Sequence, residues 1–364
     1  MPDSLEDQVP LEGPASRKSR QAGRGSVTIE DVAALAGVST KTVSRVVNAE
    51  PNVRVETTRA VQQAILELNY RPNLSARNLA GSRAYLIALL YDNPSDSYLV
   101  SLQEGALYAC EQLGYSLILF PAKLDSSRMV EDVVAFVKER RLSGVVIAPP
   151  LSDLAPLLDA LELTEVDYAR ISPRDTSRPG PVVTMDHRRA SRELTDFLIA
   201  QGHRRIAFIK GPEAHGAASL RFEGFLDAHR EHGLPVEQGL IVQGAFTFET
   251  GQECGRLLLA RPDRPTAIFA SNDDMAAGVL HTAHELGVRV PGELSVAGFD
   301  DSSLSRQVWP GLTTIRQPVR AMSEAAVRML VTAVRNRHQA SSDVSNVNVL
   351  PHELIVRNST AQCD

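Results

Sequence analysis

This chain has few of the features that mark a disulfide-stabilised, metal-binding or membrane protein. Its three cysteines, Cys110, Cys254 and Cys363, are scattered without metal-ligand spacing, and an odd number cannot form a complete set of disulfides. We therefore expect reduced thiols, no metal site and no cofactor. No apolar run is long enough to cross a membrane, and the N-terminus has no signal-peptide core, which indicates a cytoplasmic protein without a membrane partner.

Positive charge is scarce overall and concentrated in one region. The 364 residues carry a net charge of −6, which alone argues against binding to nucleic acid. Residues 13–83, however, hold eleven Lys and Arg against five Asp and Glu, a local balance of +6. Residues 1–26 are expected to be a disordered tail whose basic cluster either solubilises the chain or contacts the DNA backbone. The electrostatic footprint of phosphate binding thus lies in the N-terminal region.

The sequence from residue 27 predicts two short helices joined by a glycine turn. Thr28 and Asp31 have the spacing of a capping box, and Gly37 ends the helix that they begin. Ser39 caps the second helix. A third helix, from about Glu56 to Asn69, completes a three-helix core. The apolar residues expected in that core are Ile29, Val32, Ala33, Ala36, Val43, Val46, Val47, Val61, Ala64, Ile65 and Leu68.

The second helix presents side chains suited to the major groove of DNA. That groove offers donors, acceptors and thymine methyls, and Thr40, Lys41 and Arg45 are spaced to contact them. Other polar residues are suited to phosphates, which position the domain without reading sequence. These further DNA-binding candidates are Thr28, Ser39, Thr42, Ser44, Asn48, Thr57, Thr58, Tyr70 and Asn73. The alternative is that these polar residues are only the helix caps and solvated surface residues that any small three-helix domain needs.

Residues 73–82 form a short segment with helix-forming residues. Isolated helices of fewer than about 12 residues are marginal in water, so we expect this segment to fold only when something packs on it. Ala76 and Leu79 share one face, and a leucine on a paired hinge helix can wedge into a minor-groove base step. An ordinary linker with a stray apolar pair is the alternative.

This N-terminal segment resembles the headpiece of the lactose repressor (LacI/GalR) family. The matching motifs are D-V-A-x-x-A-G-V-S from Asp31, T-V-S-R-V-V-N from Thr42, L-N-Y-x-P-N from Leu68 and L-A-G from Leu79. The resemblance implies that Thr40, Lys41 and Arg45 occupy base-reading positions, and that Ala76 and Leu79 occupy minor-groove hinge positions. It continues to the ending P-H-E-L-I-V-R-N-S-T from Pro351 and so covers nearly the whole chain after Ser26.

Beyond residue 83, short apolar runs alternate with amphipathic segments. Continuous apolar strands separated by helices predict parallel sheets covered on both faces. The expected strands are Leu86 to Tyr91, Ser116 to Phe120, Gly144 to Ala148, Tyr168 to Ile171, Val182 to Met185, Arg205 to Ile209, Ala267 to Ala270 and Leu294 to Phe299. The expected helices are Leu102 to Leu113, Met129 to Arg140, Ala190 to Gln201, Leu220 to His232, Thr250 to Leu259 and Met275 to Leu286.

These units predict an α/β fold with two doubly wound lobes. The resemblance implies a periplasmic-binding-protein-like core with a cleft between the lobes. The expected domain organisation is a helix-turn-helix domain over residues 27–72, a hinge helix over 73–82 and an effector-binding and dimerisation core over 83–360.

In parallel α/β sheets a ligand lies beyond the carboxyl ends of the strands, so polar residues after each apolar run are candidate ligand contacts. Carboxylates, amides and guanidinium groups bind sugar hydroxyls, and aromatic faces cover C–H patches. The candidates from position are Asp92, Asn93, Tyr98, Ser172, His215, Asn272 and Asp300. The resemblance implies that Arg221, Phe246, Asn272 and Asp300 match the family's effector-contacting positions.

Several of these residues also have simpler explanations. Asp273 and Asp301 either line the site or cap the helices that follow them. Arg221 alternatively forms only a surface or interdomain salt bridge, and we take Trp309 as structural. Ser172 stands where the lactose repressor has an acidic residue, so we expect a carbohydrate or related small metabolite as effector and name no particular sugar.

Together these observations predict a ligand-controlled transcriptional repressor that binds a near-palindromic operator as a homodimer. The absence of a leucine-rich heptad tail argues against a tetramer. A corepressor-dependent repressor or an activator uses the same parts and remains open. A solute-binding protein and a glycoside-processing enzyme are more distant alternatives. The pairs Asp273/Asp274 and Asp300/Asp301 resemble paired carboxylates, yet neighbours in sequence normally point different ways, so we expect no enzyme activity.

Overall fold

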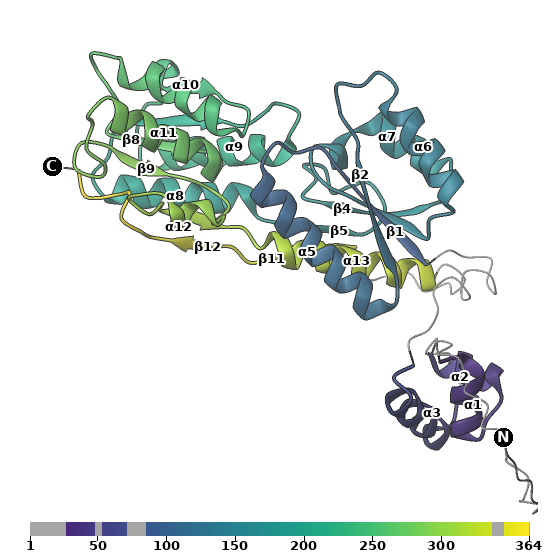
Figure 1. Ribbon diagram of the computed structural model, residues 1–364. Coiled ribbons are helices and arrows are strands. Elements are labelled where there is room, and N and C mark those ends of the chain that lie inside the picture. The colour runs from purple at the N-terminus through teal and green to yellow at the C-terminus, as the bar shows by residue number, and fades with distance from the viewer. Residues whose placement is uncertain (1–26, 48–52, 71–84, 337–345, 364) are drawn as a thin grey trace, which may run out of the picture. The chain divides into compact units, whose positions relative to one another are not determined.

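The computed structural model describes residues 27–47, 53–70, 85–336 and 346–363 (Figure 1). The chain divides into two compact units, Met1–Ala80 and Gly81–Asp364. The predicted tail (1–26) and hinge helix (73–82), with Asn48, Asn73, Ala76 and Leu79, lie outside the described residues.

The N-terminal unit contains the three predicted helices, α1 (Ile29–Ala36), α2 (Thr40–Val47) and α3 (Val55–Glu67). The capping box is confirmed, because Thr28 N donates to Asp31 Oδ2 at 2.8 Å and Asp31 N donates to Thr28 Oγ1 at 3.4 Å. Gly37 ends α1 in the left-handed conformation, with φ 66°. The buried core residues of the unit are Val32, Ala33, Val43, Val61 and Ala64.

The third helix ends earlier than the sequence predicts. Its last residue is Glu67, whereas the periodicity favours Asn69. Asn69 has φ 48°, in the left-handed region that asparagine tolerates, and so cannot continue the helix. Tyr70 then packs against the headpiece core.

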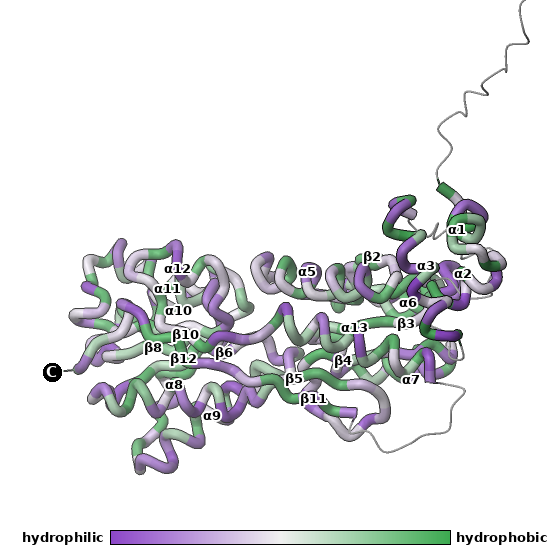
Figure 2. The backbone as a smooth tube through the Cα atoms, turned by 90° about the horizontal axis from the view of Figure 1, so that it is seen from below, coloured by the Kyte–Doolittle hydropathy of each residue, from purple (hydrophilic) through white to green (hydrophobic). Residues whose placement is uncertain are grey.

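The first lobe of the larger unit is built on a six-stranded parallel sheet in the order β11-β5-β4-β3-β1-β2. Its strands are β1 (Leu86–Tyr91), β2 (Ser116–Pro121), β3 (Gly144–Ile147), β4 (Asp167–Ile171), β5 (Val182–Met185) and β11 (Val347–Leu350). Its helices are α5 (Asp96–Leu113), α6 (Met129–Arg140), α7 (Ala155–Glu162) and α13 (Val319–Asn336), with the short 3-10 helix η1 (Leu151–Asp153). The strands β3 and β5 are largely apolar, as buried strands must be (Figure 2).

The second lobe is built on a four-stranded parallel sheet in the order β7-β6-β8-β9. Its strands are β6 (Ile206–Lys210), β7 (Ile241–Gln243), β8 (Ala267–Ala270) and β9 (Ser295–Ala297). Its helices are α8 (His187–Ala200), α9 (Gly216–Glu231), α10 (Phe248–Leu259), α11 (Asp273–Glu285) and α12 (Leu304–Gln307), with η2 (Gln238–Leu240). A small antiparallel pair, β10 (Thr314–Arg316) with β12 (Glu353–Ile355), joins this lobe to the C-terminal segment.

Within the described residues the chain passes between the lobes three times, after β5, after β10 and after β11 (Figure 1). The third passage is possible because β11 returns to pair with β5 at the edge of the first sheet. The two-lobed α/β architecture is therefore confirmed. It places the carboxyl ends of strands from both sheets around one cleft.

Some elements were absent from the sequence expectation. The seven unpredicted α-helices and strands are α7, α12, α13, β7, β10, β11 and β12. The longest, α13, has a regular buried stripe that periodicity alone identifies. It also approaches α5 closely, since a Cβ on Gly105 would lie 2.1 Å from the Arg320 carbonyl oxygen. The other six are short, or interact with segments distant in sequence.

Candidate effector pocket and nucleic-acid surface

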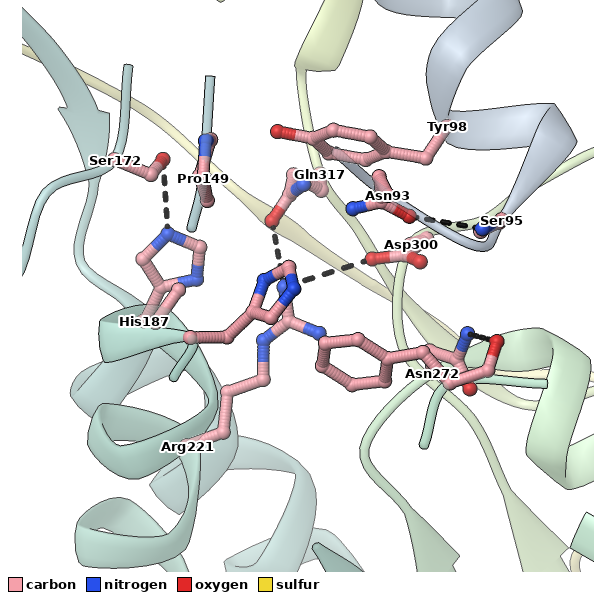
Figure 3. A pocket seen from close by; sticks show the side chains of 13 residues that line it. Asn93, Ser95, Tyr98, Pro149, Ser172, His187, Arg221, Asn272, Asp300 and Gln317 are labelled. Atoms are coloured by element: carbon pink, nitrogen blue, oxygen red, sulfur yellow. Dashed lines mark hydrogen bonds and ion pairs between the residues drawn. The ribbon is translucent and has the colours of Figure 1, made fainter. Parts of the chain in front are cut away.

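One cavity lies between the two lobes, at the carboxyl ends of their strands (Figure 3). The side chains close around it and leave about 20 Å³ of free space, room for about one water molecule, so a small-molecule ligand enters only when the lobes move apart. The lining residues are Asn93, Ser95, Tyr98, Pro149, Ser172, His187, His215, Ala217, Arg221, Phe246, Asn272, Asp300 and Gln317. Both lobes and a segment that passes between them contribute.

Arg221 lies at the base of this cavity. It projects from α9 and is buried, with the guanidinium carbon 3.9 Å from the centroid of the Phe299 ring. Its Nη1 donates to the carbonyl of Ser271, and its Nη2 donates to Gln317 Oε1 at 3.0 Å. Burial lowers the pKa of Arg221, and the neighbouring Asp300 opposes that shift. Because the side chain is buried, its ion pair with Asp300 is not a surface salt bridge.

Asp300 is the acidic partner of Arg221. Its Oδ1 lies 3.7 Å from Arg221 Nη2, and burial raises the pKa of Asp300 well above its usual value while Arg221 opposes that shift. The backbone holds it at φ 122°, and two other pocket residues, Ser172 and Phe246, have φ 44° and 63°. Positive φ is unfavourable for residues with a side chain, and such strain concentrates at functional sites.

Asn272 has two structural roles beside its place in the pocket. Its Oδ1 caps α11 by accepting from Met275 N at 3.0 Å, and its Nδ2 donates to the Phe246 carbonyl at 3.0 Å. The cap of α11 is therefore Asn272, and the expectation that Asp273 caps this helix is corrected. Asp273 instead accepts from Thr314 Oγ1 and from Ser302 N, both at 2.7 Å, because its carboxylate points inward.

Asp301 is likewise not a helix cap. The residue before α12 is Ser303, and the Asp301 carboxylate instead accepts from Arg357 at 2.6 Å and from Arg316 at 2.8 Å. Asp300 and Asp301 therefore point to different partners, as do Asp273 and Asp274, whose Oδ2 accepts from Ser95 Oγ. Neither sequence pair forms the facing carboxylates that glycoside hydrolysis requires.

Two imidazoles complete the wall of the cavity. His215 precedes α9 and meets the Phe246 ring edge-on, with the ring centroids 5.2 Å apart. Burial, and then the charge of Arg221, lower the pKa of His215 to about 4. His187 starts α8, and its Nε2 lies 3.1 Å from Ser172 Oγ. Burial also lowers the pKa of His187 well below its usual value, so both rings are neutral at pH 7.

Eight of the nine candidate effector residues line this cavity, and Asp92 does not. Asp92 Oδ2 accepts from Leu124 N at 2.8 Å, beside a separate surface hollow lined by Asp92 and residues 123–125. Successive side chains at the end of a strand point to opposite sides, so only Asn93 of this pair faces the cleft. Trp309 lies outside the cavity, and its side chain is 90% exposed.

Five lining residues were absent from the candidate set, namely Ser95, Pro149, His187, Ala217 and Gln317. His187 follows β5 by two residues, so the rule about strand ends indicates it as well as Ser172. Gln317 follows β10, a three-residue strand without a sequence signal of its own.

The exposed side of α2 carries the predicted base-reading residues. Thr40 and Lys41 are exposed and Arg45 is partly exposed, while Val43 on the opposite side is fully buried. Three other candidates, Thr28, Ser39 and Thr42, serve in helix caps. Thr42 N, for example, donates to Ser39 Oγ at 3.2 Å. Ser44 and Thr57 are partly exposed on α2 and α3.

Comparison with known proteins identifies the chain. Residues 28–73 match the family of bacterial regulatory proteins of the lacI type, and residues 195–360 match a periplasmic binding protein-like domain. The HTH-type transcriptional repressor PurR of Escherichia coli O139:H28 (strain E24377A / ETEC) is 35% identical over 352 residues, which are 92% of this chain and 97% of that relative. The chain belongs to the lacI family. It is therefore a DNA-binding transcriptional regulator, and its relatives are regulators rather than enzymes.

Solved structures of the lacI family support the same assignment over the whole chain. The lac repressor dimer bound to operator and the anti-inducer ONPF has a TM-score of 0.71 at 29% identity, covering 93% of this chain and all of that one. A complex of the transcriptional regulator CelR with cellobiose has a TM-score of 0.69 at 30% identity, covering 92% of this chain and 99% of that one. Among the described residues, no helix is long and apolar enough to span a membrane, and no cluster of side chains suits a metal ion.

Proposed function

We propose that this lacI-family regulator is a repressor, released from a near-palindromic operator when a sugar or sugar-derived effector binds in the cavity that Arg221 and Asp300 line. The observation that carries the proposal is this buried ion pair in a cavity between two lobes. The amides of Asn272, Asn93 and Gln317 also line the cavity, and such groups bind hydroxyls, while Phe246 and Tyr98 offer ring surfaces for C–H patches.

The DNA-binding part of the proposal rests on α2 and the segment after α3. Thr40, Lys41 and Arg45 would read base edges in the major groove, and the further polar candidates would contact phosphates. Residues 73–82 would fold as paired hinge helices on the operator, with Ala76 and Leu79 at the minor groove. The regulator would act in the cytoplasm, on the bacterial chromosome.

A homodimer would match the twofold symmetry of such an operator. Exposed apolar side chains are present on the outer face of α5, where Val100 and Leu107 are 54% and 50% exposed. Trp309 and Leu257 of the second lobe are more exposed still. Apolar surface of this kind is typical of contacts between subunits, and the lac repressor of similar fold is described as a dimer.

Coupling between the two sites requires the effector to prefer one arrangement of the lobes. A ligand that binds both arrangements equally shifts nothing, however tightly it binds. The composition of the cavity supports such a preference, because its lining comes from both lobes and a ligand there contacts both at once. A change in the lobe arrangement would then alter the hinge segments and lower operator affinity.

The test is binding of the purified protein to DNA fragments from upstream of its own and neighbouring genes. Fluorescence anisotropy at fixed salt, with and without a panel of sugars and sugar derivatives, gives the operator and the sign of the effect. Release by one compound supports an inducible repressor, whereas tighter binding indicates a corepressor. Asp300→Asn should weaken the effector response while operator binding without effector is retained. Specific DNA binding that no compound alters would contradict the proposed control by effector.

A further inference from the structure

The pocket contains three buried polar atoms without a hydrogen-bond partner among the described residues. They are His187 Nδ1, Arg221 Nε and Asp300 Oδ1, and the last of them has only the 3.7 Å ion-pair contact to Arg221. Leaving such atoms unpaired is unfavourable, so their gathering in one cavity indicates a ligand that pairs with them. Figure 3 shows the free nitrogen of His187 on the side of the ring that faces the other pocket side chains.

The surroundings of His187 determine whether its unpaired nitrogen, Nδ1, is a hydrogen-bond donor or acceptor. The other ring nitrogen, Nε2, lies 3.1 Å from Ser172 Oγ, and that hydroxyl donates to Met322 Sδ at 3.8 Å. With the hydroxyl hydrogen directed at the sulfur, Ser172 accepts from Nε2–H. Nδ1 is then a bare acceptor. The cavity therefore offers one neutral acceptor at His187, one N–H donor at Arg221 and one carboxyl oxygen at Asp300.

The charges around the cavity limit the class of ligand. Among the described lining residues Arg221 is the one cation, and it faces the carboxyl group of Asp300. Two more carboxyl groups, those of Asp273 and Asp274, interact with Asp300 from behind the wall. A phosphate or carboxylate on the ligand would meet more acidic groups than basic ones, and the one cation there is already paired with Asp300. An uncharged hydroxyl, which both donates and accepts, satisfies all three free atoms.

We propose that the effector is an uncharged polyhydroxylated compound, and that His187 determines its specificity by accepting a hydrogen bond from one ligand hydroxyl at Nδ1. This deepens the proposed function and rests on it. Arg221 Nε–H donates to a second ligand oxygen, and Asp300 Oδ1 accepts from a further hydroxyl. The structure thus assigns a neutral sugar or polyol to this pocket in place of a sugar phosphate or a uronic acid.

The test uses full-length protein and matched ligand sets, measured by thermal shift and calorimetry. The probes are glucose, galactose and cellobiose, with glucose 6-phosphate, glucuronate, glucosamine and hypoxanthine as charged or aromatic counterparts. We expect a neutral sugar to bind at least about 100-fold more tightly than its phosphorylated or carboxylated counterpart. Stronger binding by a phosphate, carboxylate, amine or purine would overturn the proposal, and if that compound also altered DNA binding, the proposed regulation by an effector would still stand.

Two variants isolate the role of His187. In His187→Gln the side-chain amide replaces Nε2 and keeps the contact with Ser172 but removes the acceptor at Nδ1, whereas in His187→Asn the amide replaces Nδ1. With the monodeoxy analogues of the sugar that binds, wild type should lose about tenfold or more in affinity for the analogue lacking the hydroxyl that contacts Nδ1. The Gln variant should not distinguish that analogue from the parent sugar, and the Asn variant should retain part of the discrimination.

The outcomes separate this inference from the proposed function. Equal discrimination in wild type and His187→Gln overturns the role of His187, while sugar-dependent release of DNA in the same samples leaves the repressor proposal intact. If no compound of any class shifts either the melting temperature or operator binding, both proposals fail. Circular dichroism spectra and operator affinities of the ligand-free variants, expected to match wild type, exclude misfolding as the cause, whereas some loss of melting temperature follows from the burial of His187.

Discussion

Ser95 and Asp274 belong to different lobes, and the Ser95 hydroxyl donates to Asp274 Oδ2 at 2.6 Å. Ser95 precedes α5 in the N-cap position, but its side chain makes no bond to its own helix. It is 4% exposed, and burial raises the pKa of Asp274. A second contact between the lobes, from Arg174 Nη2 to Glu223 Oε1, measures 2.8 Å. The closed arrangement of the lobes is therefore held by specific side-chain bonds as well as by the three chain passages.

Replacing Ser95 by alanine should favour the open arrangement. A hydrogen bond to a charged group contributes about 1.5–3 kcal/mol, so the equilibrium between closed and open forms should shift by roughly tenfold or more. We expect weaker effector binding by a similar factor and a larger radius of gyration in small-angle scattering. Ser101→Ala is the matched control, since among the described residues the Ser101 hydroxyl bonds only to the Ser97 carbonyl within α5. Equal scattering and affinity in both variants would remove the Ser95 contact from the closing mechanism.

Removing Arg221 should destabilise the large unit as well as abolish the effector response. Breaking a buried ion pair by deleting one partner costs about 3–5 kcal/mol, because the other charge is left unpaired. Arg221→Ala should therefore lower the free energy of unfolding by several kcal/mol, measured in urea by circular dichroism. Adding Asp300→Asn should restore part of that loss. Arg289→Ala is the control, because the Arg289–Glu293 pair is exposed and such pairs contribute at most about 1 kcal/mol. A loss equal to that of the control would contradict the importance of burial.

Acidification should destabilise the large unit partly through His215. The pKa of His215 is lowered to about 4 in the folded protein, against about 6.5 in an unfolded chain. Between these values the unfolded chain binds more protons, so stability falls as pH falls from about 6.5 to about 4, by up to about 3 kcal/mol. Asp273 has the opposite effect on the pH dependence of stability. Its pKa is raised to about 7, so its contribution to stability decreases as pH rises toward that value.

The difference between wild type and His215→Gln isolates the histidine from these opposing groups. Urea unfolding of both proteins at several pH values between 4 and 7 gives the two stability curves. The wild-type curve should fall more steeply toward low pH than that of the variant. Parallel curves would show that His215 does not titrate differently in the two states.

Local chemistry predicted the headpiece well. Thr28, Asp31 and Gly37 define the first helix through contacts within three or four residues, and such signals are present in the sequence itself. The eight strands expected from apolar runs are all present, because buried parallel strands are continuous apolar segments. The short strand β10 was missed because its pairing with β12 depends on a segment about forty residues away.

The pocket was predicted less completely for a related reason. The rule that ligands lie beyond strand ends found Asn93, Asn272 and Asp300, but it does not say which of two adjacent side chains faces the cleft. The directions of the Asp92 and Asp273 side chains are set by their partners, Leu124 N and Thr314 Oγ1, which lie about thirty and forty residues away in the sequence. Such choices depend on tertiary contacts that local patterns do not contain.

Substitution of Lys41 should change operator preference more than overall DNA affinity. The side chain is exposed near the start of α2, beside Thr40, and the likeness to the lacI family implies a base-reading position here. A good base contact discriminates against the wrong base by about 1–3 kcal/mol, whereas a phosphate contact contributes equally on all sequences. Lys41→Ala should therefore alter the half-site selected from a randomised operator library. Gln62→Ala, exposed on α3, is the control and should leave the selected sequence unchanged. If Lys41→Ala selects the wild-type half-site and only weakens binding with a reduced salt dependence, then Lys41 contacts the phosphate backbone rather than a base.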